Sequence, residues 1–360
     1  MVFKVKTVRD AWRWRRGQRR PLSRDPHLLL GRMTALGDWL EGRNYVGIDV
    51  NPDNPSKFIA TVPAFASIGW LNLTDLTRNS IYRRKADACL SKILDDQQAD
   101  GCWLFPYRFR KNPPDFPYAC ESFMTIEGLM AYATRIEKTD RLTTAIDKAL
   151  QFLLTNVGYD GNAFYYSSAD KIRIPNISSM AARVFAEAGM LFRRADYTEL
   201  AGRFALYCVS QQEQDGSYPY TEGQREVCVP YHALETWELA EANRWLANPD
   251  VSHSLSRAIQ FLDRTLQENE YATFYPLRRR GGLLKTPIWS AKAFLSMGLV
   301  EKALDHFCRG LELFGIPDAG HYFYVMQNFR GFRFPQCDTP YIRYNASAFE
   351  IGTSLLCRIQ

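Results

Sequence analysis

The chain has 360 residues, of which 46% are hydrophobic, 14% aromatic and 23% charged. This composition excludes an intrinsically disordered chain, because 22 Phe, 19 Tyr and 8 Trp supply enough apolar surface for a large core. It also excludes a membrane-spanning helix, which needs about 20 mostly apolar residues in a row. The longest purely apolar runs, such as residues 28–30, are far shorter.

Positive charge is concentrated at the N-terminus. The formal net charge is +6, yet residues 1–24 alone hold nine basic residues and one acidic residue. We therefore predict a basic arm over 1–24 and one domain over 25–360. Arginines around Trp12 and Trp14 are typical of a segment that lies on an anionic membrane surface. A solvated arm whose Trp side chains pack on the domain is the simpler alternative, and nucleic acid is a less favoured partner.

The arm is followed by no apolar segment of the kind that a secretory signal contains. The eight Cys residues form no CxxC pair, which predicts a reducing compartment without disulfides and without a zinc site. We accordingly expect a cytoplasmic protein, with potential membrane association through the arm. No phosphate-binding glycine motif is present, and we expect no cofactor and no metal.

Along the chain, helical patterns of two types alternate. A helix with one apolar stripe belongs on the outside of a packed layer, and a helix that is apolar all round belongs inside it. The predicted outer helices are 26–41, 81–98, 141–156, 197–212, 252–267 and 299–314. The predicted inner helices are 63–73, 122–134, 177–189, 231–242, 289–299 and 345–357. No strand-rich stretch is expected between them, so the pattern predicts about six helical hairpins.

A short phrase recurs between each outer helix and the next inner helix. An Asp-Gly pair ends the outer helix and an aromatic cluster follows, at 100–107, 160–166 and 215–220, with weaker copies at 270–276 and 315–324. Glycine accommodates the left-handed backbone after a helix, and Asp accepts a nearby backbone N–H. We therefore predict a structural role for most of these Asp-Gly pairs.

A row of hairpins either stacks into an open solenoid or closes into a ring. Open arrays need polar helices at both ends. The last predicted helix stays apolar almost to the C-terminus, which favours closure against the first hairpin. The inner helices would then line a barrel, with the aromatic loops around one end.

At this point the repeat resembles a known one. The phrases Gln97-x-x-Asp100-Gly101-x-Trp103 and Gln211-x-x-x-Asp215-Gly216 are similar to the QxxDGxW repeat of the terpenoid cyclase and protein prenyltransferase superfamily of α/α toroids. More closely, the chain resembles uncharacterised toroid proteins encoded near bacterial polysaccharide-biosynthesis genes. That likeness covers 81–356 and rests on 176–182, 215–220 and 339–349. It implies an all-α, (α/α)6-like toroid and a role in glycan metabolism.

The acidic motifs of terpenoid enzymes are missing. No DxDD motif is present, and residues 95–100 only approach the DDxxD motif. Glycoside hydrolases, polysaccharide lyases and uronyl epimerases also use toroids with such repeats.

Polar residues at the starts of the inner helices are the best site candidates, because ring closure would gather them at one end of the barrel. His232 and Glu235 are three residues apart on one helix and form a candidate base and its orienting group. We predict catalytic roles for His232, Glu235 and Tyr344. The predicted substrate-binding residues are Arg173, Asn176, Arg343, Trp103, Tyr107, Tyr220, Tyr231, His321 and Tyr324. The alternatives are a satisfied buried pair for His232 and Glu235, and pairing of the arginines with turn aspartates.

Three functions remain open. The first is an enzyme that acts on a glycan or glycosyl precursor, because aromatic rings stack on sugars. Proton abstraction beside a uronate held by Arg would give a lyase or epimerase, whereas two carboxylates across the sugar would give a hydrolase. The second is a non-catalytic toroid that binds a glycan or a protein. The third is an isoprenoid cyclase or transferase.

Overall fold

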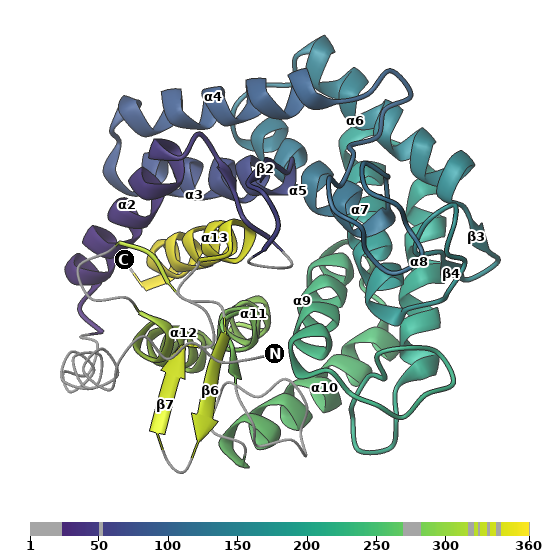
Figure 1. Ribbon diagram of the computed structural model, residues 1–360. Helices are drawn as coiled ribbons and strands as arrows, with labels where there is room; N and C mark the ends of the chain where they lie inside the picture. The colour runs from purple at the N-terminus through teal and green to yellow at the C-terminus, as the bar shows by residue number, and fades with distance from the viewer. Residues whose placement is uncertain are drawn as a thin grey trace.

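The computed structural model describes residues 24–49, 53–268, 282–315, 320–322, 325–329, 332–335 and 340–359. Within them, twelve α-helices form an outer and an inner layer around one axis (Figure 1). The outer helices are α2 (Pro26–Gly42), α4 (Ser80–Asp96), α6 (Asp140–Phe152), α8 (Ala195–Gln211), α10 (Pro249–Glu268) and α12 (Val300–Phe314). The inner helices are α3 (Thr61–Thr77), α5 (Ala119–Arg135), α7 (Pro175–Phe192), α9 (Val229–Leu246), α11 (Lys285–Ser296) and α13 (Ile342–Ile359). The predicted all-α toroid is confirmed.

The burial of each helix follows its apolar pattern. In α6 only one stripe is buried, which includes Leu142, Ile146 and Ala149. In α7 nearly every residue from Pro175 to Gly189 is buried. A helix in the inner layer has neighbours on all sides, whereas an outer helix faces solvent on one side. The alternation of the two patterns is therefore what sorts the helices into layers.

The ring closes where the last helix meets the first hairpin. Helix α13 packs against α3 and α2 (Figure 1), and Phe349 fills the space left by two glycines. A Cβ atom on Gly69 would lie 2.5 Å from the Phe349 ring, and one on Gly37 would lie 2.8 Å from it. Asn72 of α3 donates hydrogen bonds to the hydroxyls of Thr353 and Ser354, both at 3.0 Å.

The two ends of the ring differ in their connections. Because successive helices run in opposite directions, every inner helix begins at the same end, which we call the mouth. Six long segments enter the inner helices there, at 43–60, 97–118, 153–174, 212–228, 269–284 and 315–341. Short turns join each inner helix to the next outer helix at the opposite end. Long loops at one end are where a rigid scaffold normally carries its functional residues.

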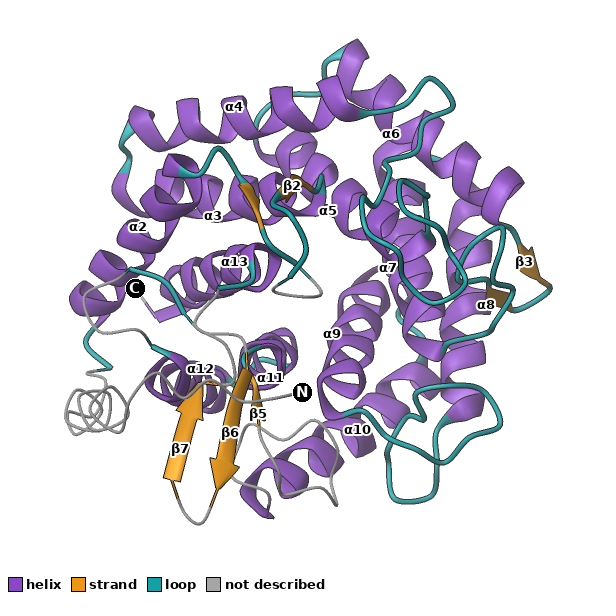
Figure 2. Cartoon of the chain, in the orientation of Figure 1, coloured by secondary structure: helices purple, strands orange, loops and turns teal. Residues whose placement is uncertain are grey.

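Short strands occur in the long segments, contrary to the expectation that no strand-rich stretch interrupts the helices. Two antiparallel pairs join β1 (Val46–Gly47) to β2 (Lys57–Phe58) and β3 (Tyr159–Asp160) to β4 (Ala163–Phe164). A three-stranded sheet is formed by β5 (Gly282–Leu283), β6 (Val325–Phe329) and β7 (Phe332–Pro335) (Figure 2). Apolar and polar residues alternate in part of 325–335, which is a strand signal. A search for helical periodicity does not detect it.

The repeated Asp-Gly turns connect neighbouring outer helices. Gln97 donates to the carbonyls of Gly101 and Ala145, both at 2.9 Å. In the third copy, Gln212 donates in the same way to Gly216 and Ser254, at 3.0 and 2.9 Å. The repeat is thus Gln212-x-x-Asp215-Gly216, which corrects the alignment that began at Gln211.

The turn aspartates also have a structural function. Asp100 and Asp215 accept the backbone N–H two residues later, at 3.3 and 2.9 Å. Both turns lie on the outer wall, where each ties the end of one outer helix to the side of the next. The structural role predicted for these two Asp-Gly pairs agrees with this geometry.

Several predicted features lie outside the described residues. They are the arm except for Arg24, the whole copy at 270–276, and Tyr324. In the described part of the chain, no helix is long and apolar enough to cross a membrane.

We predict that Gly216→Ala lowers the free energy of unfolding by at least about 2 kcal/mol. Gly216 has a φ of +93°, and an added Cβ would lie 2.5 Å from the backbone oxygen of Arg257. Gly223→Ala is the control for backbone strain alone, because its φ is +75° with no atom within 4 Å. Gly202→Ala, in a helix with open space around it, should be neutral or stabilising. Urea unfolding of the three variants gives the comparison. Equal losses in Gly216→Ala and Gly223→Ala would contradict the proposed contact between the turn and α10.

Candidate functional site

A buried ion cluster lies at the mouth, where the last inner helix meets the first two hairpins. Arg343, the second residue of α13, lies 2.8 Å from the Asp49 carboxylate and also pairs with Glu121 of α5. Asp49 is completely buried and Glu121 is 2% exposed. One guanidinium therefore holds two carboxyl groups that come from different hairpins, in the bridging geometry that Arg provides better than Lys.

Glu121 has two further donors. The hydroxyls of Thr61 and Tyr118 donate to its two oxygens at 2.9 and 3.1 Å. Burial raises the pKa of Glu121 above its ordinary value, although the charge of Arg343 and these hydrogen bonds lower it. Burial thus favours the protonated form of Glu121, and the charge of Arg343 opposes it.

Lys285, the first residue of α11, lies among aromatic rings beside this cluster. Its ammonium is 4.1 Å from the ring centre of Tyr231, 5.4 Å from Trp289 and 5.7 Å from Tyr344. The side chain is buried, and burial lowers the pKa of Lys285. Cation–π contacts stabilise a charged ammonium where water is largely excluded.

These groups belong to a closed circuit of side chains around the mouth, which we call the collar. Tyr118 stacks on Tyr166 with ring centres 5.3 Å apart. Arg110 lies 5.4 Å above Tyr166 and hydrogen-bonds to Tyr220, and Tyr220 stacks on Tyr231 at 5.1 Å. The members, in order around the circuit, are Arg343, Glu121, Tyr118, Tyr166, Arg110, Tyr220, Tyr231, Lys285 and Tyr344.

Two further layers fill the barrel beneath the collar. Trp237 and Trp289 meet edge to face at 5.7 Å. Below them, one charged side chain from each of five inner helices joins a buried ion network: Glu127, Arg183, Glu238, Lys292 and Glu350. These two layers separate the collar from the opposite end of the barrel.

The helix ends at the mouth lack side-chain caps. The N-cap residues of α3, α5, α7, α9 and α11 accept no backbone N–H with their side chains. At the other end, α2, α4 and α6 begin with Asp25, Asn79 and Thr139 as capping side chains, whereas α8 and α12 have no side-chain cap. Unpaired N–H groups and the positive ends of helix dipoles favour acceptors and anions. The mouth therefore favours ligands rich in oxygen.

Four residues predicted for binding or catalysis meet in the collar: Arg343, Tyr344, Tyr220 and Tyr231. Asn176, the second residue of α7, is 5% exposed, and its side-chain oxygen has no hydrogen-bond partner. An unsatisfied buried amide oxygen is uncommon in native proteins. Asn176 therefore remains a candidate for binding a ligand near the mouth.

His232 is placed differently. Its Nδ1 accepts the backbone N–H of Tyr218 at 3.1 Å, and its Nε2 lies 3.0 Å from the carbonyl oxygen of Ala258. The fourth residue of two other inner helices likewise accepts a backbone N–H from the preceding aromatic loop. Ser178 accepts the N–H of Phe164 at 3.0 Å, and Asn345 accepts the N–H of Tyr322 at 2.9 Å. The recurrence supports a role for His232 in fixing its aromatic loop, which is not the catalytic role expected from the sequence.

Glu235 does not meet His232 either. It is 2% exposed and its polar neighbour is the Cys208 thiol of α8, while its Oε1 has no hydrogen-bond partner. Burial raises the pKa of Glu235 well above its ordinary value, and it lowers the pKa of His232 to about 4. Both groups are thus neutral and buried between helices. The three-residue spacing did not bring them together, because the two side chains face different outer helices.

The other predicted binding residues lie on the walls and the rim. Trp103 is buried and donates to the carbonyl of Ile93 at 2.9 Å. Tyr107 donates to Pro55 at 2.9 Å, which ties two long loops together. Arg173 pairs with Asp160 and Glu222 at 3.0 and 3.3 Å on the loop surface.

His321 stacks on Trp39 of α2 with ring centres 4.6 Å apart. That contact places it over the outer layer rather than over the collar.

The site residues that sequence reasoning missed are Asp49, Arg110, Tyr118, Tyr166 and Lys285. Asp49 lies beside a turn-rich loop, where no helical pattern marks a candidate. Lys285 was missed because the predicted inner helix began at 289. A signal was available in the prolines near the inner-helix starts. Proline favours the first helical turn, and Pro175, Pro230 and Pro287 lie within one or two residues of Asn176, Tyr231 and Lys285.

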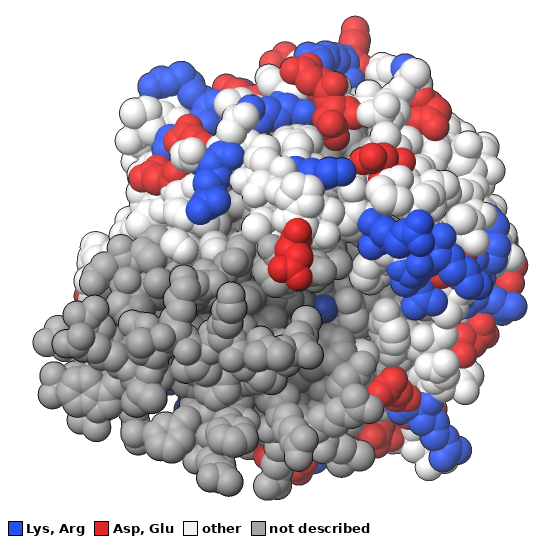
Figure 3. Space-filling model, viewed as in Figure 1, with Lys and Arg blue, Asp and Glu red and all other residues white. Residues whose placement is uncertain are grey.

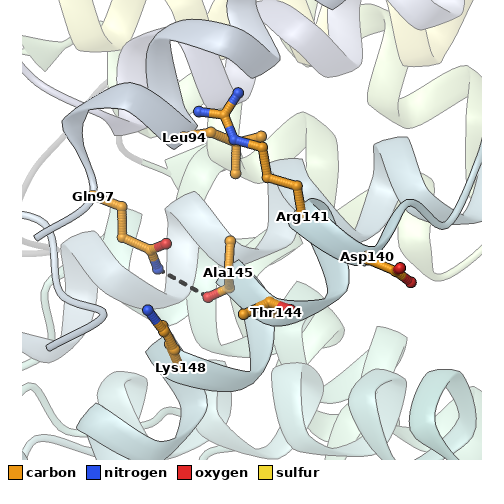
Figure 4. A pocket seen from close by; sticks show the side chains of 7 residues that line it. All are labelled: Leu94, Gln97, Asp140, Arg141, Thr144, Ala145 and Lys148. Atoms are coloured by element: carbon orange, nitrogen blue, oxygen red, sulfur yellow. Dashed lines mark hydrogen bonds between the residues drawn. The ribbon is translucent and has the colours of Figure 1, made fainter. Parts of the chain in front are cut away.

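A shallow pocket of about 300 Å³ lies on the outer wall between α4 and α6 (Figure 4). It is lined by Leu94, Gln97, Asp140, Arg141, Thr144, Ala145 and Lys148. Gln97 is already bonded across it to the carbonyl of Ala145, and Arg141 pairs with Asp95 at 2.7 Å. Among the described residues, no group of three His, Cys, Asp or Glu side chains is placed to hold a metal ion.

Solved structures with the same architecture include three carbohydrate-acting proteins. An unsaturated glucuronyl hydrolase of Bacillus sp. GL1 has a TM-score of 0.69 and 12% identity, over 92% of this chain and 96% of its own. A GH76 alpha-mannanase of Bacteroides thetaiotaomicron has a TM-score of 0.65 and 11% identity, over 93% and 98%. The cellobiose 2-epimerase of Spirochaeta thermophila has a TM-score of 0.64 and 12% identity, over 94% and 100%.

At these identities the likeness shows the fold alone, and none of the three is a terpenoid cyclase or a prenyltransferase. That part of the sequence resemblance is not supported by them and stays a prediction. The sequence itself gives no match to models of protein families or to curated proteins.

We predict that His232→Ala lowers the free energy of unfolding by about 2–4 kcal/mol, because it opens a cavity and leaves the buried Tyr218 N–H unpaired. His232→Asn should lose clearly less, since Asn345 holds the equivalent N–H with an amide oxygen. Denaturant unfolding measures both variants. If His232→Ala were as stable as the wild type, the ring would not be fixing the loop.

Glu235 gives a pH-dependent prediction. The folded protein keeps this carboxyl protonated above pH 4.5, whereas the unfolded chain releases the proton there. Stability therefore falls as pH rises through that window, by about 1.4 kcal/mol per pH unit for this one group. Glu235→Gln should remove this pH dependence. The variant should therefore be more stable relative to the wild type at pH 8 than at pH 5. Melting temperatures across this range test it, and parallel curves for both proteins would contradict the buried, neutral carboxyl.

Proposed function

We propose that the protein is a glycan-processing enzyme, and that the collar at the mouth of the toroid is its active site. The observation that carries the proposal is the pair of carboxyl groups, Asp49 and Glu121, joined by Arg343 inside a circuit of tyrosines. Sugar chemistry at the anomeric carbon commonly uses two carboxyl groups, one protonated and one ionised. Carbohydrate-acting neighbours of the same architecture agree with this assignment.

The two carboxyl groups have different environments. Glu121 has a pKa raised by burial, which suits a general acid that donates a proton to a leaving oxygen. Asp49 is paired to Arg343 at 2.8 Å, and an adjacent guanidinium favours the ionised form of a carboxyl group. We assign Asp49 as the base or nucleophile and Arg343 as the group that orients both. This pairing favours hydrolysis over elimination or epimerisation.

The walls of the collar suit a sugar ring. Tyr220 and Tyr231 are partly exposed, and their stacked rings offer the flat apolar surface on which pyranose C–H faces pack. Asn176 supplies an unsatisfied amide oxygen for a hydroxyl. Basic side chains gather on the surface over the loops beside α7 and α8 (Figure 3). A glycan that carries carboxylates would gain from these charges and from the uncapped helix ends.

The substrates we propose are glycans of polysaccharide or glycoconjugate metabolism. A non-catalytic glycan-binding toroid is the second candidate. The ion pairs of Arg343 with Asp49 and Glu121 favour it, because ion pairs that hold the closed ring together need no catalytic role. Turnover distinguishes the two functions, since a binding protein leaves the glycan unchanged.

The test is incubation with a panel of neutral and uronate-containing oligosaccharides, followed by product analysis. New reducing ends indicate hydrolysis, an unsaturated sugar indicates elimination, and a changed sugar without new ends indicates epimerisation. We expect new reducing ends. Glu121→Gln should lower kcat/KM by at least about 100-fold, the loss typical of a missing general acid.

Glu235→Gln is the matched control, because it replaces another buried glutamate of an inner helix that lies away from the collar. It should keep wild-type turnover. Melting temperatures must show that Glu121→Gln is folded. A folded Glu121→Gln with unchanged kcat/KM, or glycan binding without turnover in the wild type, would contradict the proposed enzyme.

A further inference from the structure

The ion network beneath the tryptophan layer contains more carboxyl groups than cations. Its five members are three glutamates and two cations: Glu127, Glu238, Glu350, Arg183 and Lys292. The glutamates are at most 4% exposed, and the side chains of Arg183 and Lys292 are 11% and 10% exposed. With every group ionised, three negative and two positive charges would leave a net charge of −1 where water hardly reaches.

The three glutamates share the two cations unequally. Glu127 lies between both, 2.6 Å from Arg183 and 3.1 Å from Lys292. Glu350 places its two oxygens 3.1 and 3.3 Å from Lys292. Glu238 has the longest contact, with one oxygen 3.4 Å from Arg183. The pair of Glu127 with Lys292 also spans the barrel from α5 to α11, so the network joins helices that are not neighbours in the ring.

The charges next to the network do not balance it. Glu187 of α7 contacts the network's arginine at 2.9 Å and is itself 23% exposed. Glu241 of α9 acts on the same arginine but is paired with Arg244 at 2.6 Å. The charged residue of α3, the remaining inner helix, is Asp75, which pairs with Arg135 at 3.9 Å. These flanking groups therefore enlarge the excess of carboxyl groups.

A buried carboxyl group without a cation of its own keeps its proton, because burying an uncompensated charge costs more free energy. Burial raises the pKa of Glu238 to about 8, against the charge of Arg183, and it also raises the pKa of Glu350. Despite its burial, Glu127 has a lowered pKa, because the charges of Arg183 and Lys292 favour its ionised form. The glutamate with the longest contact is thus the one that most readily stays protonated.

We propose that the network takes up one proton as the barrel forms, and that its three glutamates hold this proton as a unit. The ring then closes around a neutral network. Loss of the proton leaves a negative charge between the inner helices, so closure depends on pH. The unfolded glutamates release their protons above about pH 4.5. The stabilisation is therefore complete below that pH and is lost as the pH rises to about 8. Helix α13 carries both Glu350 and Arg343, so the ion cluster of the collar depends on the same closure.

A proton that is shared has a distinctive consequence. If Glu238 alone bound it, replacing the ionised Glu127 would leave the proton where it is. If the network holds it as a unit, Glu127→Gln leaves two glutamates for two cations, and Glu238 then ionises.

The experiment is urea unfolding of the full-length protein between about pH 5 and pH 7, where the pH dependence of the unfolding constant counts the protons released. Glu127→Gln should release one proton fewer than the wild type, so that its unfolding constant rises about tenfold less per pH unit. Glu350→Gln should do the same, and it serves if Glu127→Gln fails to fold. Lys292→Met should release one proton more, because a cation is lost. Other buried groups, such as Glu235 and His232, titrate alike in every variant and cancel.

Lys302→Met is the matched control, because Lys302 pairs with Asp263 at 2.6 Å but is 47% exposed. It should release as many protons as the wild type. The proposal is overturned if Glu127→Gln and Glu350→Gln also release as many protons as the wild type, since the proton would then belong to one residue. It is equally overturned if Lys292→Met releases no more protons than the wild type, since something other than a proton would then balance the charge.

Discussion

Closure of the ring is the constraint on which the rest of the structure depends. Helix α13 must pack against α3, and the glycines at positions 37 and 69 make room for Phe349 at that contact. Without closure, the starts of six inner helices would be spread along an open surface. With it, they converge on one mouth, and residues as distant in the chain as Asp49, Glu121 and Arg343 become neighbours. The candidate site is therefore a product of the closed ring and of no single hairpin.

The repeat stabilises the ring at its outer edge, and its inner edge carries the residues of the proposed site. On the outside, Gln97 and Gln212 tie consecutive outer helices together through the Asp-Gly turns. Deeper in, the fourth residue of three inner helices fixes the backbone of the aromatic loop that precedes the helix. The first three residues of the inner helices differ between hairpins and include Glu121, Asn176, Tyr231, Lys285 and Arg343. We propose that the residue types at these positions follow the ligand instead of the packing.

The two ends of the molecule differ in the length of their connecting segments. Long segments and the inner-helix starts together supply the tyrosines and the charged groups at the mouth. Short turns at the other end leave little room for such a site. The proposed site thus follows from one topological fact, that every inner helix begins at the same end.

The sequence by itself determined the helices, their sorting into two layers and the closure of the ring. These follow from local patterns, because a stripe of apolar residues or a wholly apolar helix states how many sides are buried. It also indicated the end of the barrel where Arg343, Tyr344, Tyr220 and Tyr231 gather. Only the tertiary structure decided which polar residues share the site. Helix spacing placed His232 and Glu235 on one face of α9. That face contacts two outer helices, and His232 meets α10 whereas Glu235 meets α8. Asp49 and Lys285 became recognisable only when closure brought them to Arg343 and Tyr344, because contacts between distant segments leave no periodic trace in the chain.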